Sequence, residues 1–392
     1  MPRKPVLATI IASSLLLAGC TQDIERQAQK GEPPAAPSSF IGLASPVDLP
    51  FQDNYVNALI GFSESGDPRV LKTSPVVYSN TLMRFDDGFA FATPTGVEVY
   101  DDSGLLNQKY EAEVSGMLML ATSSANYSHV SFAHNVSSPE QPERHSIQTI
   151  SDGGQRFTES NSFPMGLTTC DDGRVMWVDV DGLLAVMSEN LAADERVAVL
   201  VRADSDGTVT RTPLSDDIPL AGNDAVIDCD SENASFTVFD EQQNVQLIVV
   251  EDAFSSEVRT SWVKLDPPPP TSTLPRNGGA YNGIYFSVLN DGSVSMRQGF
   301  QDPVLFREKL DLGGDKPLFA TFDGAFVTVV HYPPEDDSIS RATVFSLDDF
   351  SCHSAPQPLD FWGSDEISSL NASSGSNLHL SAVLPVEKPV RC

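Results

Sequence analysis

The chain has 392 residues, of which 24 are lysine or arginine and 54 are aspartate or glutamate, so its formal net charge is −30. This excess of negative charge argues against binding to nucleic acid or to an anionic lipid surface, because both would repel the chain. The length suffices for one large all-β domain or for two smaller domains.

Residues 1–19 have the order of an export signal. Arg3 and Lys4 precede an apolar run of 13 residues, from Val6 to Ala18, which is too short for a comfortable bilayer-spanning helix. The run ends in Leu17-Ala18-Gly19-Cys20. We therefore predict a signal peptide over residues 1–19. An ordinary secretory signal followed by a chance cysteine is the alternative.

The last four residues of this segment resemble the lipobox of bacterial lipoproteins. The resemblance implies that the sulfur of Cys20 carries fatty acyl groups such as palmitate, and that the chain is cut before this residue. Long acyl chains hold a protein on a membrane, since each buried methylene contributes ~0.8 kcal/mol. We expect a lipid-anchored protein on the extracytoplasmic face of the cell membrane or envelope. The number of membranes in the organism stays open.

Residues 20–45 are predicted to be a lipidated, flexible tether. Glutamine, glutamate, lysine and glycine give way there to a stretch rich in proline and serine, which contains Pro33, Pro34, Pro37, Ser38 and Ser39. Such a composition cannot bury enough apolar surface to offset the entropy lost on ordering. The tether would hold the following domain away from the membrane.

From about Phe51 onward, short β-type runs alternate with tight turns. The runs are five to seven residues long and rich in β-branched and aromatic residues, as in Met117–Ser123, His129–Asn135 and Ile284–Leu289. Asp-Gly pairs between the runs favour hairpin turns, because glycine adopts positive φ without a steric penalty. The predicted fold class is therefore all-β.

The pattern of run, turn and second run repeats at intervals of 39 to 60 residues, around Gly88, Tyr127, Gly173, Asn233, Gly283, Gly324 and Gly375. An interval of this length fits a four-stranded antiparallel unit. Seven such units predict a β-propeller over residues 46–392, an architecture that leaves only short, protected strand edges. Six or eight blades, a β-sandwich, or two smaller β domains are the alternatives.

The final repeat is incomplete. It holds two good runs, Ile367–Leu370 and Leu378–Leu384, and the segment before the first repeat supplies two more, Val56–Phe62 and Val70–Val77. We therefore predict that strands from the N-terminal and C-terminal parts of the chain pair within one blade and close the ring.

Four cysteines follow Cys20, and an even number in an exported chain indicates two disulfides. Cys170 and Cys229 occupy matching places in consecutive repeats, which favours the pairing Cys170–Cys229 and leaves Cys352 with Cys392. The other two ways of pairing these four cysteines stay open. No two cysteines have the close spacing of zinc ligands, so we expect no metal at these residues.

One segment is similar to the Asp box of sialidase-like propellers, namely Ile150-Ser151-Asp152-Gly153-Gly154-Gln155-Arg156-Phe157. Asp152, Gly154 and Phe157 match the box, whereas Ile150 stands where a hydroxyl residue belongs. The resemblance implies a structural hairpin between the outer strands of a blade, and not a catalytic site.

No motif in the chain indicates catalysis, a cofactor or a metal. Asp204–Gly207 is similar to the beginning of a calcium loop, but Ser215 stands where such a loop needs a bidentate acid. Gly61–Ser65 comes near a nucleophile elbow, but Ser65 replaces its second glycine. Walker, Rossmann and His-Glu-x-x-His signatures are missing from the sequence.

These observations favour a binding or scaffold module for proteins of the cell envelope over an enzyme. This preference for a binding role comes from analogy with other propellers, which present broad surfaces of loops to their partners. The alternatives are a hydrolase acting on carbohydrate or lipid, and a propeller that binds a small solute in its channel. The sequence alone selects no pair of catalytic carboxylates.

Overall fold

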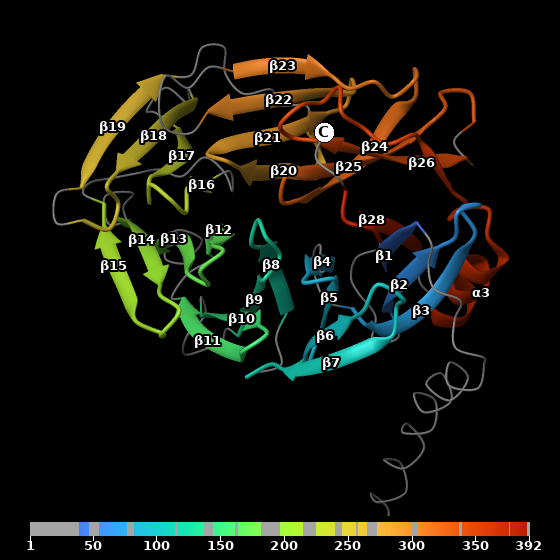
Figure 1. Ribbon diagram of the computed structural model, residues 1–392, viewed down its shortest axis with the longest axis horizontal. Helices are drawn as coiled ribbons and strands as arrows, with labels where there is room; N and C mark the ends of the chain where they lie inside the picture. The colour runs from blue at the N-terminus through green and yellow to red at the C-terminus, as the bar shows by residue number, and fades with distance from the viewer. Residues whose placement is uncertain are drawn as a thin grey trace, which may run out of the picture. The chain divides into compact units, whose positions relative to one another are not determined.

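Seven four-stranded antiparallel sheets are arranged as the blades of a ring, which confirms the predicted seven-bladed β-propeller (Figure 1). The computed structural model describes residues 39–46, 55–76, 82–113, 117–136, 144–160, 164–181, 197–214, 225–239, 245–255, 258–264, 273–298, 305–336, 339–375 and 377–389. All structural statements below concern these residues. The innermost strands of most neighbouring blades contact one another at the centre of the ring.

The blades are numbered in chain order, and each is given from its innermost strand outward. They consist of blade 1 with β4 (Leu82–Phe85), β5 (Gly88–Thr93), β6 (Gly96–Tyr100) and β7 (Leu106–Glu111); blade 2 with β8 (Met117–Ser123), β9 (His129–Asn135), β10 (His145–Ser151) and β11 (Gly154–Ser160); blade 3 with β12 (Met165–Thr169), β13 (Val175–Asp181), β14 (Val197–Ala203) and β15 (Val209–Pro213); blade 4 with β16 (Val226–Ile227), β17 (Ala234–Phe239), β18 (Val245–Glu251) and β19 (Arg259–Lys264); blade 5 with β20 (Thr273–Tyr281), β21 (Ile284–Leu289), β22 (Ser293–Gln298) and β23 (Leu305–Lys309); blade 6 with β24 (Lys316–Asp323), β25 (Phe326–Tyr332), β26 (Ser340–Ser346) and β27 (Gln357–Leu359); and blade 7 with β28 (Leu378–Pro385), β1 (Phe40–Pro46), β2 (Val56–Phe62) and β3 (Pro68–Pro75).

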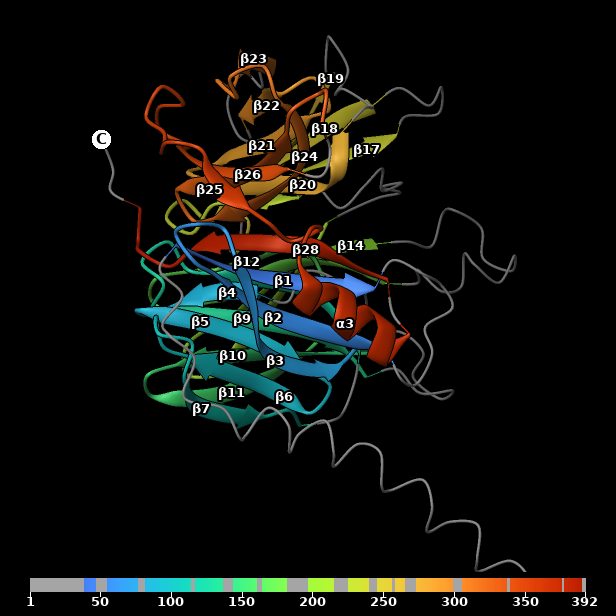
Figure 2. The same ribbon diagram turned by 90° about the vertical axis from the view of Figure 1, so that its right-hand side faces the viewer.

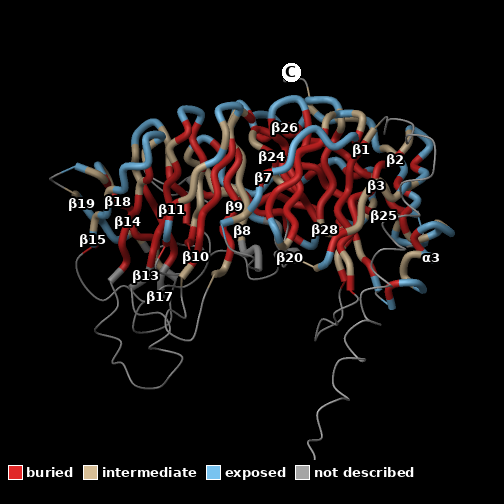
Figure 3. The backbone as a smooth tube through the Cα atoms, turned by 90° about the horizontal axis from the view of Figure 1, so that it is seen from below, coloured by how far each residue is buried: buried red, intermediate tan, exposed pale blue. Residues whose placement is uncertain are grey.

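Apolar side chains fill the spaces between adjacent blades. Met83 and Phe85 of blade 1 pack with Val130 and Phe132 of blade 2, and similar clusters of described residues join the other neighbouring blades except blades 4 and 5. The inner strands of a blade are therefore buried on both faces, and β5 is buried at every position, whereas outermost strands such as β7 are largely exposed. Figure 3 shows buried strands between exposed turns.

The predicted repeat marks one structural position in six of the seven blades. Gly88, Tyr127, Gly173, Asn233, Gly283 and Gly324 all lie in or beside the turn that joins the first strand of a blade to the second. Tyr127, Gly173 and Gly324 adopt positive φ in these turns. We call the side of the ring that holds these turns the mouth face. The seventh position, Gly375, is different, because it ends a helix.

Blade 7 closes the ring with strands from both parts of the chain. β28 is the innermost strand and pairs with β1, for example Ile41 with Leu384, and β1 pairs in turn with β2. The predicted closure between N-terminal and C-terminal strands is thus confirmed, as are β2 and β28. However, β1 lies within residues predicted as tether. The tether prediction is wrong for residues 40–45, since a strand paired on both edges belongs to the propeller. The remainder of the tether lies outside the described residues.

The predicted strand Ile367–Leu370 is also wrong, because these residues belong to helix α3 (Asp365–Ser374). The side chain of Ser364 accepts hydrogen bonds from the first free N–H groups of the helix, and Gly375 ends it at φ 65°. Glu366 accepts a hydrogen bond from the backbone N–H of Val70 at 2.8 Å, so α3 covers part of the outer edge of blade 7 (Figure 2). Within the described ranges, no helix is long and apolar enough to cross a membrane.

A largely buried cluster, which we call the closure latch, joins the ends of the innermost strands of blades 1, 6 and 7 to one another and to the mouth-face turn of blade 2. It consists of Arg84, Tyr127, Asp323, Pro385 and Val386. The Arg84 Nε donates to the Asp323 carboxylate at 2.9 Å, and its other nitrogens donate to the carbonyl oxygens of Pro385 and Val386. The Tyr127 hydroxyl donates to the Asp323 carbonyl at 3.2 Å. The latch thus holds the end of β28 to blades 1, 2 and 6 without a covalent bond.

Candidate functional site

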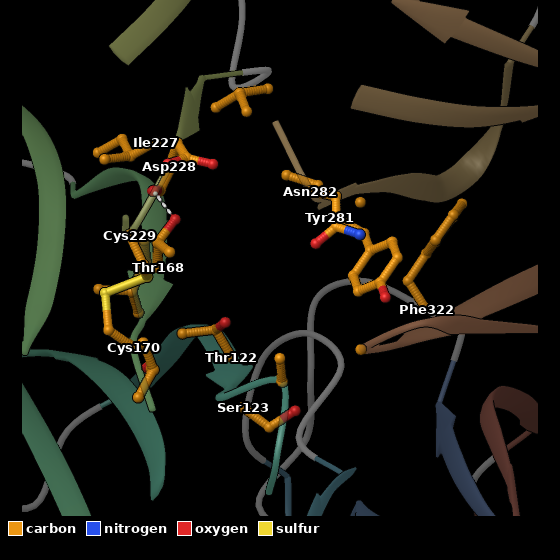
Figure 4. A pocket seen from close by; sticks show the side chains of 18 of the residues that line it. Thr122, Ser123, Thr168, Cys170, Ile227, Asp228, Cys229, Tyr281, Asn282 and Phe322 are labelled. Atoms are coloured by element: carbon orange, nitrogen blue, oxygen red, sulfur yellow. Dashed lines mark hydrogen bonds between the residues drawn. A yellow bond between two sulfur atoms is a disulfide. The ribbon is translucent and has the colours of Figure 1, made fainter. Parts of the chain in front are cut away.

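A cavity of about 550 Å³ opens at the mouth face, in the volume range of small-ligand sites. Blades 1 to 6 all contribute lining residues, mostly from the ends of their innermost strands and from the turns that follow. In Figure 4, Asp228 and the disulfide lie on one wall, and Tyr281 and Phe322 lie on the wall across from them. The cavity is therefore the candidate functional site.

The disulfide between Cys170 and Cys229 lies in the wall of this cavity. The two Cα atoms are 5.6 Å apart, and the cysteines follow β12 and β16, the innermost strands of neighbouring blades. This pairing confirms the prediction made from their matching places in the repeat. It ties the mouth-face turn of blade 3 to that of blade 4.

Four carboxylates and one guanidinium line the cavity. The carboxylates are those of Asp171, Asp172, Asp228 and Asp230, and the guanidinium is that of Arg174. We call these four aspartates the acidic rim. Asp171, Asp172 and Asp230 are exposed and Asp228 is half-buried, so the rim presents net negative charge to solvent.

Each of the three nitrogens of the Arg174 guanidinium already donates a hydrogen bond. Its Nε donates to Asp172 at 2.7 Å, a second nitrogen donates to the Cys229 carbonyl at 2.9 Å, and the third donates to Glu232. Glu232 also binds Arg202 at 2.9 Å. The side chain of Arg174 therefore holds the two turns together and has little capacity left for an anionic ligand.

Two of the remaining rim carboxylates, those of Asp171 and Asp228, are oriented by uncharged donors. Asp228 accepts hydrogen bonds from the backbone N–H groups of Asp230 and Ser231, at 3.0 and 2.7 Å. Asp171 accepts one from the N–H of Asn126 at 3.0 Å. In the part of the chain that the structure describes, Asp171, Asp228 and Asp230 form no ion pair, so their charges are available to a ligand.

Asp172 is held in its ionised form. Desolvation opposes ionisation, but the hydrogen bonds and the charge of Arg174 outweigh it, and the pKa of Asp172 is lowered from its ordinary value. A carboxyl group with a lowered pKa is a poor proton donor at neutral pH. Asp172 therefore contributes negative charge rather than general-acid chemistry.

The wall opposite the disulfide is aromatic and depends on two glycines of β20. A Cβ atom at Gly278 would lie 2.0 Å from the Tyr285 hydroxyl, and one at Gly279 would lie 2.6 Å from the Phe322 ring. Any larger residue would displace these rings. The pair Gly278-Gly279 thus explains how two aromatic side chains approach the strand backbone.

A buried hydroxyl also belongs to the lining. Thr169 is 4% exposed, and its Oγ1 has no hydrogen-bond partner among the described residues. A buried hydroxyl without a partner costs free energy, which a bound ligand or water would recover. The Thr169 Oγ1 is shielded from solvent in this structure, so a ligand would reach it only if the wall of the cavity shifted.

The other sequence candidates lie elsewhere. Cys20 is outside the described residues, as is Cys392, so the lipid anchor and the pairing Cys352–Cys392 stay predictions. The Asp-box-like segment forms the hairpin between β10 and β11, the outer strands of blade 2, as its resemblance implied. Asp204–Gly207 forms the turn between β14 and β15, where the Gly207 N–H donates to the Asp204 carbonyl.

Sequence reasoning missed the acidic rim. Its residues form two short sequences around the cystine, Cys170-Asp171-Asp172 and Asp228-Cys229-Asp230. This adjacency was visible in the chain, but only ring closure shows that both turns face one cavity. Among the described residues, no group of three or more His, Cys, Asp or Glu side chains is arranged to hold a metal ion.

No family model matches the chain, and no curated protein does. Among solved structures, the chain is similar to hydrazine synthase from Kuenenia stuttgartiensis, with TM-score 0.44, 12% identity, and coverage of 74% of this chain and 89% of that one. It is also similar to a β-propeller domain from Myceliophteria thermophila (TM-score 0.40, 12% identity, 73% and 88% covered). A gluconolactonase from Xanthomonas campestris gives TM-score 0.38, with 13% identity over 77% and 95%. Likenesses at this level carry no argument about function, and the seven-bladed fold rests on the strand pairing itself.

Proposed function

We propose that this propeller is a binding module that receives a positively charged ligand at the acidic rim of its channel. The observation that supports the proposal most directly is the excess of four carboxylates over one engaged guanidinium around an open cavity. Charge complementarity of this kind attracts and orients a cationic partner. The whole chain, with net charge −30, adds a long-range attraction of the same sign.

The ligand that fits best is a basic segment of another protein. Lysine and arginine side chains have long apolar stems and charged ends, so a stem would lie against the aromatic wall while its end meets the rim. Tyr281 and Phe322 supply that wall, and Asp228 faces it across the cavity (Figure 4). We accordingly assign the partner to the cell envelope, where the lipobox resemblance of Cys20 would place this chain.

The experiment is a pull-down of the membrane-anchored protein, with its neighbours identified, in three forms. These are the wild type, the rim variant Asp228→Asn/Asp230→Asn, and the control variant Glu335→Gln. Glu335 is an exposed acid between β25 and β26, a connection on the opposite face from the mouth. We expect a set of basic neighbours that the rim variant loses and the control keeps. Equal recovery by all three forms would contradict the assignment of the site.

The anchor needs its own test, because it rests on the sequence alone. Cys20→Ala should abolish labelling by a radioactive fatty acid and leave the precursor uncut or the protein released. Equal labelling of the variant would overturn the anchor without affecting the cavity assignment.

Binding of a small cationic solute is the second candidate function, and the cavity volume of about 550 Å³ favours it. The two candidates differ in size dependence. Decalysine should bind more tightly than free lysine if a basic protein segment is the ligand, because several charges engage the rim together. Equal affinity for the two would favour the solute.

A further inference from the structure

Every carboxylate of the acidic rim lies within two residues of a disulfide cysteine. Asp171 and Asp172 follow Cys170 directly, and Asp228 and Asp230 flank Cys229. The four charges therefore sit on two short turns that come from different blades. The Sγ–Sγ bond is the covalent connection between those turns.

Negative charges gathered on two neighbouring turns repel one another, and the repulsion favours separation of the turns. The disulfide opposes it, as do the contacts of Arg174 with Asp172, Glu232 and the Cys229 carbonyl. Arg156 and Arg202 add positive charge beside the same turns, through contacts with the Gly173 carbonyl and with Glu232. Arg174 neutralises only part of the charge. The disulfide holds the turns together whatever their charge, so it is the stronger constraint.

We propose that the Cys170–Cys229 disulfide positions the acidic rim, and that its redox state controls the affinity of the cavity for cationic ligands. The inference rests on the proposed function and adds regulation to the same site. In the oxidised form the two acid pairs are held around one cavity. In the reduced form the contacts of Arg174 hold the turns together without the covalent bond, so the turns move apart more easily and fewer carboxylates act on a ligand at once.

The remaining structure keeps the blades folded when the bond is broken. The turn of blade 3 is held by its own hydrogen bonds, from the Cys170 N–H to the Arg174 carbonyl at 2.8 Å and from the Gly173 N–H to the Cys170 carbonyl at 3.0 Å. The turn of blade 4 has a bond from the Asp228 N–H to the Asn233 carbonyl at 2.9 Å. Reduction therefore loosens the relation between two turns rather than the blades themselves.

The redox step requires an external dithiol. Its thiolate attacks the Sγ of Cys229, which is half-buried in the cavity wall, and Cys170 leaves as a thiolate that takes up a proton. The second thiol of the reagent then attacks the mixed disulfide, which releases Cys229 as a thiol. The cystine gains two electrons and two protons, and the dithiol becomes a disulfide.

The test measures binding of decalysine to the oxidised wild type and to the wild type reduced with dithiothreitol. The variant Cys170→Ser/Cys229→Ser, with and without the same reductant, is the matched control, since it removes this bond and leaves the other cysteines in place. We expect reduction to weaken decalysine binding by about ten-fold in the wild type, because rim charges act mainly through their joint arrangement. The variant should bind as weakly as the reduced wild type and should not respond to dithiothreitol.

Equal affinity of the oxidised and reduced wild type would overturn the redox control and leave the proposed function standing. Failure of the oxidised wild type to bind decalysine would overturn both. Hydrogen exchange gives a readout independent of the ligand, since reduction should speed exchange in the turns Cys170–Arg174 and Asp228–Asn233. Unchanged exchange in both turns would contradict the positioning role even if affinity fell.

Discussion

The closure latch and the acidic rim both lie on the mouth face, at the ends of the innermost strands. They differ in their charged groups, which are buried and paired in the latch but face solvent at the rim. In the latch, the guanidinium of Arg84 and the carboxylate of Asp323 are both buried and paired with each other. At the rim, the carboxylates of Asp171 and Asp228 accept hydrogen bonds from uncharged donors, and neither they nor Asp230 form an ion pair among the described residues.

The connection between blades differs as well. The latch is non-covalent and joins blade 7, which is built from distant parts of the chain, to blades 1, 2 and 6. The rim is joined by a disulfide between blades 3 and 4, which are consecutive in the chain. We conclude that the mouth face of blades 6, 7, 1 and 2 contributes to ring closure, whereas the mouth face of blades 3 and 4 exposes negative charge.

The largest effect should come from deletion of residues 40–46. β1 pairs with β28 on one edge and with β2 on the other, so its loss leaves two rows of N–H and C=O groups unpaired in the middle of blade 7. The cost should exceed the whole stability of a typical domain, about 5–15 kcal/mol. Circular dichroism melts should show no cooperative transition. Deletion of residues 21–38 is the control and should melt like the intact chain, and a cooperative melt of the longer deletion would contradict the closure.

Arg84→Met should destabilise the protein by about 3–5 kcal/mol, because it leaves a buried carboxyl and two carbonyl oxygens without their donor. Burial raises the pKa of Asp323, and the charge of Arg84 opposes that rise, so the variant should take up a proton at Asp323. Urea unfolding measures the loss. The double variant Arg84→Met/Asp323→Leu should recover part of it, and a double variant no better than the single one would show that charge pairing is not the main contribution.

Removal of the Cys170–Cys229 disulfide gives the corresponding stability test for the acidic rim. Its cysteines are 59 residues apart, and closing a loop of that length stabilises a chain by about 4 kcal/mol in the chain-entropy model. Cys170→Ser/Cys229→Ser should therefore melt at a lower temperature but still cooperatively. An unchanged melting temperature would show that the disulfide positions the two turns without stabilising the fold. A non-cooperative melt would show that blades 3 and 4 depend on it to fold.

A pH effect should arise at His134, which lies in neither region. Burial lowers the pKa of His134 to about 4, although a hydrogen bond with Gln148 acts in the opposite direction. The unfolded chain binds this proton at about 6.5, so stability should fall as the pH drops from about 6.5 to about 4, by roughly 3 kcal/mol at the low end. Urea unfolding at about pH 7 and about pH 4.5 checks the slope. His134→Leu should reduce the slope and leave the part that comes from His129 and His331, whose pKa values burial also lowers. The exposed His353→Gln should leave the slope unchanged, and equal slopes in all three proteins would contradict the assignment.

Much of the blade pattern followed from the sequence because hairpins are local. Met117–Ser123 and His129–Asn135 are strands with the predicted bounds, since alternating short runs and a tight turn fix such a pair. β1 was missed because it is buried on both faces and shows no polar alternation, and because it follows a proline-rich stretch. Gly42, in the centre of β1, is a residue that disfavours strands. The structure nevertheless needs a glycine there, because a Cβ atom at this position would lie 2.9 Å from the Phe62 ring.

The remaining misses have similar physical causes. Ile367 and Leu370 read as a short apolar run, but Ser364 and Gly375 supply the two caps that make a helix of it. The cystine was predictable because its two residues repeat at one place in the blade. The acidic rim was not, because only the closed ring places Asp171 and Asp228 on one cavity.

Hydrogen exchange with and without decalysine tests the central claim most directly, because it compares both regions in one sample. Binding at the rim should slow exchange in the turns Cys170–Arg174 and Asp228–Asn233. The turn Phe85–Gly88 beside the latch should exchange at the same rate in both states. Slowing confined to the latch turn or to the opposite face, or no slowing anywhere, would contradict the account.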